Sequence, residues 1–157
     1  MELEREASRD CIDAAITGHL RQSVEGLAVR LGPGADVRRE LESLAVSRAI
    51  SAAVMMGAVG SLAHVCLRYA NQDVSTELAG KHEILTLSGM LSQDGVHLHM
   101  MVADSQGNCK GGHVAYGCQV YTTLELAIAL LPKTKFQRTF DPATGFKELE
   151  ISPKSER

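Results

Sequence analysis

The sequence has no tryptophan, and aromatic residues make up only 4% of its 157 residues. Aromatic side chains form the stacking platforms of proteins that bind single-stranded nucleic acids, so this composition argues against such a platform. An excess of positive charge is also lacking, because sixteen lysines and arginines stand against nineteen aspartates and glutamates, giving a net charge of −3. Proteins that bind nucleic acids mainly through phosphate contacts usually carry a basic excess. The sequence therefore predicts an aliphatic core and gives no electrostatic sign of a nucleic-acid partner.

Long hydrophobic runs are missing as well, since no stretch approaches the ~20 apolar residues of a membrane span. The opening segment MELEREASRD carries four acidic side chains, which argues against a signal peptide and against a transit peptide. The four cysteines (Cys11, Cys66, Cys109 and Cys118) form no CxxC pair and no zinc-finger spacing. We therefore expect no membrane partner, reduced thiols and an intracellular, cytoplasmic location, with the nucleus as the open alternative.

What the sequence does contain suits one globular domain. Hydrophobic residues make up 45% and charged residues 22%, so the chain can bury a core. Residues 1–22 place small and aliphatic side chains at helical spacing without enough large ones for a core, which predicts a helical leader. The expected organisation is this leader, a single domain over residues 23–152 and a short tail over residues 153–157.

The first half of the expected domain alternates between strand and helix patterns. Strand patterns are found at residues 26–31, 50–60 and 61–70. The middle one is rich in small apolar residues and also suits a helix. Asp36 predicts the N-cap of a helix over 37–48, because apolar residues recur there at helical spacing. The polar segment 71–81 predicts a loop.

The second half predicts a series of hairpins. Turn signals occur at Asp94–Gly95, at 104–108 and in the Asp-Pro-Ala-Thr-Gly segment at 141–145. Strands are expected at residues 82–92, 96–103 and about 114–121. Thr123 would cap a helix over 124–131 that ends at Pro132. The total of six or seven strands with two or three helices predicts an α+β fold, a mostly antiparallel sheet with flanking helices.

Three histidines fall where they could share one face of a hairpin. His97 and His99 lie two residues apart on a strand, so both side chains point to the same face. A three-residue turn with Gly107 in the left-handed conformation sets a register in which His113 lies opposite His99. A register shifted by one residue would instead place His113 on the other face, unless a bulge at Gly111–Gly112 restored the alternation. Three imidazoles on one face are the ligand set of an open zinc site, in which a water or a small anion takes the fourth position.

Other candidate residues have ordinary structural interpretations. Asp104 suits a turn, and Glu125 suits the first turn of the predicted helix, with a general base as the weaker alternative. Cys109 and Cys118 flank the His113 strand and are interpreted as small core or edge residues, with a soft metal ligand as the alternative. The methionines expected in the core are Met55, Met56, Met100 and Met101. The basic residues are interpreted as parts of a solvated surface, with a phosphate site as the weaker alternative: Arg38, Arg39, Lys133, Lys135 and Arg138.

Longer motifs give the chain a resemblance to a known family. The segment GVHLHMMVADSQGNCKGGHVAYGCQVYTTLELAI is similar to the central motif of the PPC domain, which plants and prokaryotes share. The similarity extends through LAVRLGPGADVRRELESLA, GAVGSLAHVCLRYA, HEILTLSGMLS and FDPATGFKELEI, from near Leu27 to Ile151. The resemblance implies an antiparallel sheet with flanking helices and a homotrimer. It also implies that His97, His99 and His113 form the metal site of the prokaryotic-type branch, which plant-type members lack.

The resemblance raises DNA binding as a second function. In plant members the domain accompanies an AT-hook, whose Arg-Gly-Arg-Pro core enters the minor groove, and this sequence contains no such segment. The first hypothesis is a homotrimeric protein that binds a zinc-type metal through the three histidines. Whether it is an enzyme stays open, and an enzymatic role would use a metal-bound water with a pKa of ~7. The alternative is a DNA-binding or chromatin-associated interaction module without an AT-hook.

Self-association has a rationale in the sequence itself. The apolar segments 52–60 and 127–131 supply more aliphatic surface than one thin sheet needs. We expect part of this surface to be buried between subunits.

Overall fold

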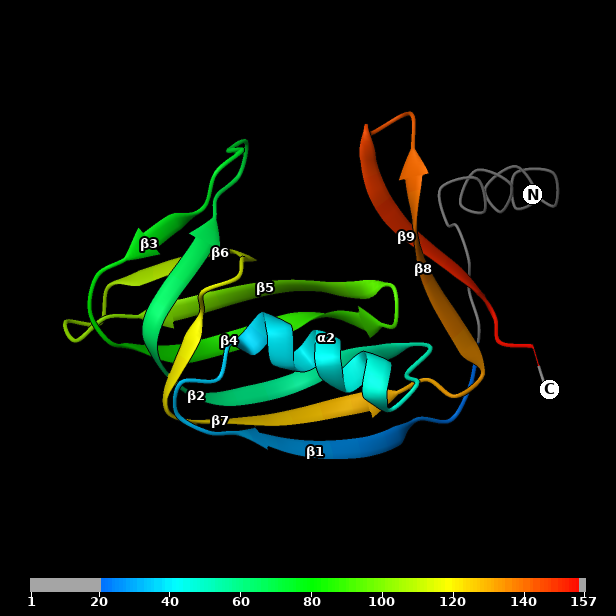
Figure 1. Cartoon of the computed structure of the whole chain (residues 1–157), viewed down its shortest axis with the longest axis horizontal. Coiled ribbons are helices and arrows are strands. Elements are labelled where there is room, and N and C mark those ends of the chain that lie inside the picture. Colours follow the sequence, from blue (N-terminus) through cyan, green and yellow to red (C-terminus); the bar gives the residue numbers. More distant parts are fainter. Residues whose placement is uncertain (1–20, 156–157) are drawn as a thin grey trace, which may run out of the picture.

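The computed structural model describes residues 21–155, which form nine strands and one helix. The predicted leader at 1–22 lies almost entirely outside the described residues. In chain order the elements are β1 (Glu25–Leu31), α2 (Val37–Ser47), β2 (Ala53–Arg68), β3 (Thr76–Leu78), β4 (His82–Ser92), β5 (Gly95–Ala103), β6 (Cys109–Val114), β7 (Gln119–Leu130), β8 (Thr134–Asp141) and β9 (Phe146–Pro153). Figure 1 shows α2 lying across a bent sheet, with the β8–β9 hairpin standing to one side.

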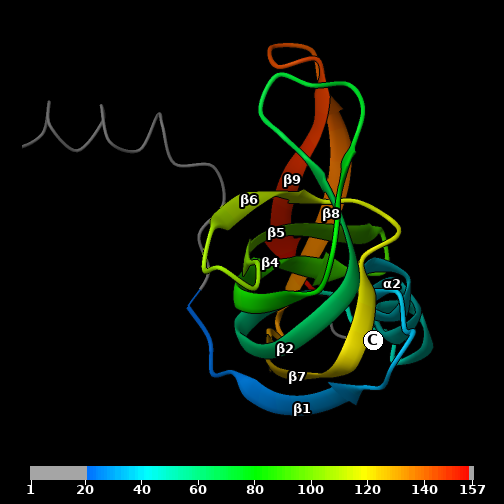
Figure 2. The ribbon, with the colours of Figure 1, turned by 90° about the vertical axis from the view of Figure 1, so that its left-hand side faces the viewer.

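Seven strands form one antiparallel sheet in the order β1-β7-β2-β4-β5-β6, with β3 paired to β2. The sheet curves until it meets itself, because the end of β2 also pairs with β6 (Figure 2). In that contact Arg68 lies opposite His113. The hairpin β8–β9 is a separate two-stranded sheet, as the turn signal at 141–145 predicts. The mostly antiparallel sheet is confirmed, and the described part of the chain has one helix where several flanking helices were expected.

The helix begins where the sequence predicts. The side chain of Asp36 caps it by accepting a hydrogen bond from the backbone N–H of Arg39 at 3.1 Å. The second carboxylate oxygen accepts one from the N–H of Gly117 at 2.7 Å, so a single side chain fixes both the helix start and the β6–β7 connection. The buried stripe of the helix consists of Val37, Leu41 and Ala45. No helix within residues 21–155 has the length and apolar character needed to cross a membrane.

Strand β2 runs unbroken through two segments that the sequence analysis treated as separate, 50–60 and 61–70. The strand interpretation of the first segment is confirmed, and its helical alternative is wrong. Gly60 shows how closely the neighbouring strand packs. A Cβ atom at this position would lie 2.2 Å from the backbone oxygen of Thr123 on β7, so only glycine fits without displacing the backbone.

The predicted helix over 124–131 is wrong, because these residues continue strand β7. Leucine and alanine have high intrinsic helix propensity, which is what the pattern reflects. In the structure every second residue from Leu124 to Ile128 is buried, while Glu125 and Ala127 are exposed. Strand β7 pairs with β1 on one side and β2 on the other, and this tertiary context overrides the propensity. Glu125 therefore opens no helix.

Two loop expectations are also corrected. The segment 71–81 is not a loop throughout, since Thr76–Leu78 forms β3 and pairs with β2. The hairpin between β4 and β5 is confirmed, but its two loop residues are Gln93 and Asp94. Gly95 already pairs with Ser92, so it belongs to the strand.

Two of the four methionines expected in the core are buried there. Met55 and Met100 are buried, whereas Met56 and Met101 are exposed. Adjacent residues on a strand point to opposite faces, so only one of each neighbouring pair can enter the core.

Candidate metal centre

The turn between β5 and β6 sets the register of the two strands that carry the histidines. Gly107 has a φ of 82°, and its N–H donates to the Asp104 carbonyl oxygen at 3.0 Å. The Asp104 carboxylate accepts hydrogen bonds from the backbone N–H groups of Gln106 at 2.8 Å and Asn108 at 2.9 Å. Hydrogen bonds from the Asn108 side chain and from these backbone groups lower the pKa of Asp104. Asp104 is therefore the turn former that the sequence predicts.

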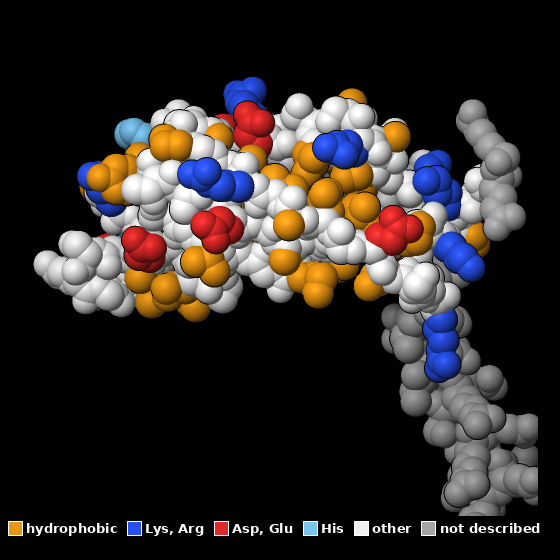
Figure 3. All heavy atoms as spheres, turned by 90° about the horizontal axis from the view of Figure 1, so that it is seen from below, with side chains coloured by type: hydrophobic (Ala, Val, Ile, Leu, Met, Phe, Trp, Pro, Cys, Tyr) orange, Lys and Arg blue, Asp and Glu red, His pale blue; other side chains and the backbone are white. Residues whose placement is uncertain are grey.

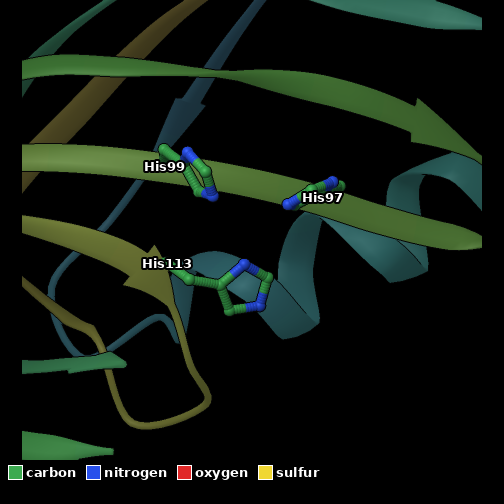
Figure 4. A group of neighbouring side chains, drawn as sticks. All are labelled: His97, His99 and His113. Carbon is green, nitrogen blue, oxygen red and sulfur yellow. The ribbon is translucent and has the colours of Figure 1, made fainter. Parts of the chain in front are cut away.

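The resulting pairing brings the three histidines together. His113 on β6 lies opposite His99 on β5, as predicted. The ring centroids are 5.0 Å apart for His97 and His99, 5.2 Å for His97 and His113, and 5.7 Å for His99 and His113. One nitrogen from each ring lies within 4.8 Å of the other two, a spacing that could hold one metal ion. Figure 4 shows the three rings facing one another across the gap between the strands.

His113 offers a ring nitrogen that no protein group contacts. Its Nδ1 atom is buried and has no hydrogen-bond partner among the described residues, and it lies on the edge of the ring that faces His97 and His99 (Figure 4). A buried polar atom without a partner costs about 1–3 kcal/mol. On the other side of the ring, Arg38 Nη1 lies 3.3 Å from His113 Nε2. Three imidazole nitrogens, one of them buried and unpartnered, are a donor set that fits a zinc-type ion.

Burial keeps two of the histidines in their neutral form. Burial, with smaller effects from His97 and Arg38, lowers the pKa of His113 to about 4. Burial and the charge of Arg138 also lower the pKa of His97 below its ordinary value. Both rings are therefore neutral at pH 7, and neutral imidazole is the form that binds a metal.

Arg38 is fixed beside His113 by a set of contacts on α2. Its Nε donates to Glu42 Oε1 at 3.0 Å, and its Nη1 donates to the Val114 carbonyl oxygen at 3.2 Å. The guanidinium also lies 4.6 Å from the ring centroid of Tyr116, whose hydroxyl donates to Glu42 at 2.9 Å. The guanidinium is thus held over the histidine site and does not lie on a solvated surface.

His97 and His113 line a pocket of about 790 Å³, whose other walls come from α2, the start of β5 and the β8–β9 hairpin. Arg38 and Arg138 line this pocket, so the expectation of a solvated surface is wrong for both. For Arg38 the sequence did contain a signal, because Glu42 lies four residues later on the same helix face and can hold the guanidinium in place by an ion pair. For Arg138 no local signal exists, because its position depends on where the last hairpin packs.

The family model of the Plants and Prokaryotes Conserved (PCC) domain matches residues 18–132. The chain belongs to this family. The PCC domain is the PPC domain that the sequence motifs indicate, so that resemblance is confirmed. The presence of His97, His99 and His113 fits the prokaryotic-type branch.

The chain also matches part of the length of longer curated relatives. The chain is 48% identical over 125 residues to the bifunctional protein GlmU of a Synechococcus strain, and the match covers 80% of this chain and 20% of that protein. A second Synechococcus GlmU is 46% identical over 128 residues. The chain thus corresponds to about a fifth of the length of these relatives.

Solved structures share the fold over nearly their whole length. A hypothetical protein from Salmonella enterica has 40% identity and a TM-score of 0.85, covering 88% of this chain and 100% of that one. A metal-containing protein from Archaeoglobus fulgidus has 27% identity and a TM-score of 0.74, covering 85% and 99%. A protein from Bacteroides thetaiotaomicron, whose name proposes DNA binding, has 20% identity and a TM-score of 0.70, covering 82% and 96%.

The remaining candidates of this PCC domain do not join the histidine cluster. Cys118 is fully buried, and its thiol donates to the Cys66 carbonyl oxygen at 3.2 Å. Burial raises the pKa of this thiol to about 11, which suits a packing residue better than a metal ligand. Cys109 is exposed at the start of β6, and the ring of His82 contacts the Gly80 carbonyl oxygen at 3.0 Å.

Proposed function

We propose that this PCC domain binds one zinc-type metal ion per subunit through His97, His99 and His113. The observation that carries the proposal is the buried Nδ1 of His113, which faces the other two rings and has no hydrogen-bond partner within residues 21–155. Binding a metal at Nδ1 would remove the cost of that unpartnered atom. The Archaeoglobus relative, named as metal-containing, supports the same proposal at 27% identity.

The proposed role is metal binding with a ligand-accessible site, and it assigns no reaction. A zinc-type ion held by three imidazoles keeps one coordination position for water or a small anion, and it lowers the pKa of a bound water to ~7. The residues of the chain position the proposed ion and give ligands access to it. Strands β5 and β6 hold the rings, α2 keeps Arg38 beside His113, and the pocket gives small molecules access.

Elemental analysis of tag-free protein tests the metal site. We expect close to one zinc-type ion per chain in the parent protein and none in the His97→Ala/His99→Ala double variant. His64→Ala is the matched control, because His64 is exposed on β2 and lies outside the cluster. A parent protein that stays metal-free after incubation with zinc, or a double variant that keeps its metal, would overturn the proposal.

We also propose that the domain forms a homotrimer. The support is an apolar surface, called here the outer face, on the exposed side of β1, β7 and β2. Met56 and Val59 are 68% and 70% exposed there. The groove beside them is lined by small residues that include Ala28, Gly57, Ala58 and Ala127. Figure 3 shows hydrophobic side chains gathered over this side of the molecule. Burial against further copies would remove this surface from water, and the number three follows from the family resemblance.

DNA binding as an interaction module is the second candidate, and one observation favours it. Four basic residues and, among the described residues, no acidic one line a pocket near the start of β8: Arg21, Lys133, Lys135 and Lys154. The name of the Bacteroides relative points the same way. Fluorescence anisotropy with duplex DNA at ~50 mM salt, where phosphate contacts are strong, tests this candidate. Binding that weakens as salt rises would support it, and no binding at that salt would exclude direct DNA recognition.

The free cysteines support the proposed intracellular, cytoplasmic location. Cys66, Cys109 and Cys118 form no disulfide within the described part of the chain. Reduced thiols of this kind are usual in reducing compartments.

A further inference from the structure

The pocket beside the histidines contains basic side chains that form no ion pair among the described residues, although the charge of Glu148 acts on one of them, Arg138. Among residues 21–155, Arg68, Arg138 and Lys147 have no carboxylate oxygen within 4.0 Å, whereas Arg38 is paired with Glu42 at 3.0 Å. All four basic side chains line the same pocket as His97 and His113. Guanidinium groups bind the oxygens of carboxylates and phosphates with two parallel hydrogen bonds, so this lining favours an oxyanion.

Arg138 combines partial burial with closeness to the metal site. Its side chain is half-buried on β8, and burial lowers its pKa. Arg138 and His97 line the same pocket, together with Glu148. The backbone N–H of Arg138 donates to Asp94 Oδ2 at 3.4 Å, a contact that joins the hairpin to the wall of the pocket. An anion beside this guanidinium would offset the cost of its partial desolvation.

The contacts of Arg38 depend on where His113 carries its proton. A neutral His113 whose Nδ1 binds a metal has its proton on Nε2. Nε2 then cannot accept a hydrogen bond from Arg38 Nη1, 3.3 Å away, because both groups are donors. Arg38 keeps its bonds to the Val114 carbonyl oxygen and to Glu42. One N–H of Nη1 is therefore left for another acceptor beside the metal site.

The charges of the pocket balance only without a metal ion. Four basic residues line it, and so do four acidic ones: Glu42, Asp73, Asp94 and Glu148. A divalent ion among the histidines would give the pocket an excess of about two positive charges.

We propose that the metal-loaded pocket binds a small dianionic oxyanion, either a phosphate group or a dicarboxylate, with Arg138 and Arg38 donating hydrogen bonds to its oxygens. The inference rests on the metal site proposed above and adds the class of its ligand. The pocket, at about 790 Å³, has the size of a small-molecule site. Phosphate and carboxylate oxygens both fit the planar guanidinium, so an experiment has to distinguish these two sources.

Calorimetric titration of cobalt-loaded protein, with inorganic phosphate and separately with malonate, tests the proposal. Metal content is measured by elemental analysis on the same samples. We expect at least one anion to bind the loaded protein. Its affinity for protein stripped of metal should be lower by about tenfold or more. Arg138→Gln should weaken anion binding about 10- to 100-fold without changing the metal content. Arg138→Lys keeps the charge but loses the planar fork, so a smaller loss is expected.

Arg39→Gln is the matched control, because Arg39 lies on the same helix as Arg38 with its side chain exposed and outside the pocket. Its anion affinity should equal that of the parent. A preference for phosphate would assign the ligand to the phosphate compounds, and a preference for malonate would assign it to the dicarboxylates. Loaded protein that binds neither anion at ~10 mM would overturn the ligand class while the metal site stands. Unchanged binding by Arg138→Gln would overturn the assigned contact, and protein that holds no metal would overturn both proposals.

Discussion

Two surfaces of the PCC domain differ in the kind of group that they leave without a partner. At the histidine pocket these groups are polar, namely His113 Nδ1 and the guanidinium of Arg138, both unpartnered by the residues that the structure describes. On the outer face they are apolar, namely Met56 and Val59. Polar groups need a few directional contacts, whereas apolar surface needs only area removed from water. The first surface therefore suits a small charged ligand, and the second suits another protein surface.

The first variant, with the greatest effect, changes the histidine pocket and leaves the outer face intact. His113→Ala removes the buried ligand nitrogen, so metal affinity should fall by about 100-fold or more. Competition with a chromophoric chelator measures the affinity, and light scattering should give the same molar mass as for the parent protein. A loss of affinity below about tenfold would remove His113 from the ligand set.

The reverse variant breaks the outer face and spares the pocket. Val59→Lys places a charge in the proposed subunit interface, so self-association should weaken about 100-fold while metal content stays that of the parent. Val74→Lys is the matched control, because Val74 is equally exposed in the connection between β2 and β3. Size-exclusion chromatography with light scattering measures both variants. A Val59→Lys protein that keeps the parental mass would show that the outer face is not the interface.

A change of pH acts on the pocket and should leave the outer face unaffected. The pKa of His113 is about 4 in the folded protein, against an ordinary value of 6.5. As pH falls, the unfolded chain binds this proton first, so the metal-free protein should lose stability between pH 6.5 and 4. With partial solvent exposure allowed for, the expected loss is about 2 kcal/mol. Urea unfolding across this range measures the loss, and His113→Gln should flatten the profile. Equal slopes for the two proteins would contradict the prediction.

The smallest expected effect concerns the helix that forms one wall of the pocket. Asp36→Ala removes the N-cap and the contact with Gly117, and it should lower the free energy of unfolding by about 1–2 kcal/mol. Asp36→Asn keeps a capping side chain and should recover most of that loss. Thermal unfolding of both variants measures the difference. Equal stability of the two variants would show that the cap does not hold the helix.

The candidate site could be predicted from the sequence where it depends on local spacing. Alternation along a strand places His97 and His99 on one face, and the turn at Gly107 then places His113 opposite His99. Arg138 could not be predicted, because nothing in its neighbourhood along the chain specifies that the last hairpin packs beside β5. Short-range rules predict the placement of the proposed metal ligands but not that of the side chains around them.

The elements of the fold also divide into those that local sequence predicts and those that depend on distant neighbours. The α2 helix was predictable because its cap, Asp36, and its buried stripe are adjacent in the sequence. The end of β7 was not, because the leucines and alanines of 124–131 satisfy both a helical and an alternating pattern. Only the neighbours β1 and β2, which lie far away in the sequence, decide between the two.

The turn at Asp104 has a consequence for how the domain would exchange the proposed metal ion. The strands that carry the histidines are aligned by backbone hydrogen bonds and by this turn, and none of these contacts uses an imidazole. The buried side of β5, with Leu98 and Met100, completes the core from the opposite face. Unlike a zinc finger, which is unfolded without its metal, the proposed site is aligned by contacts that need no ion. A chelator should therefore empty it without unfolding it, and its occupancy should rise and fall with the supply of free metal around it.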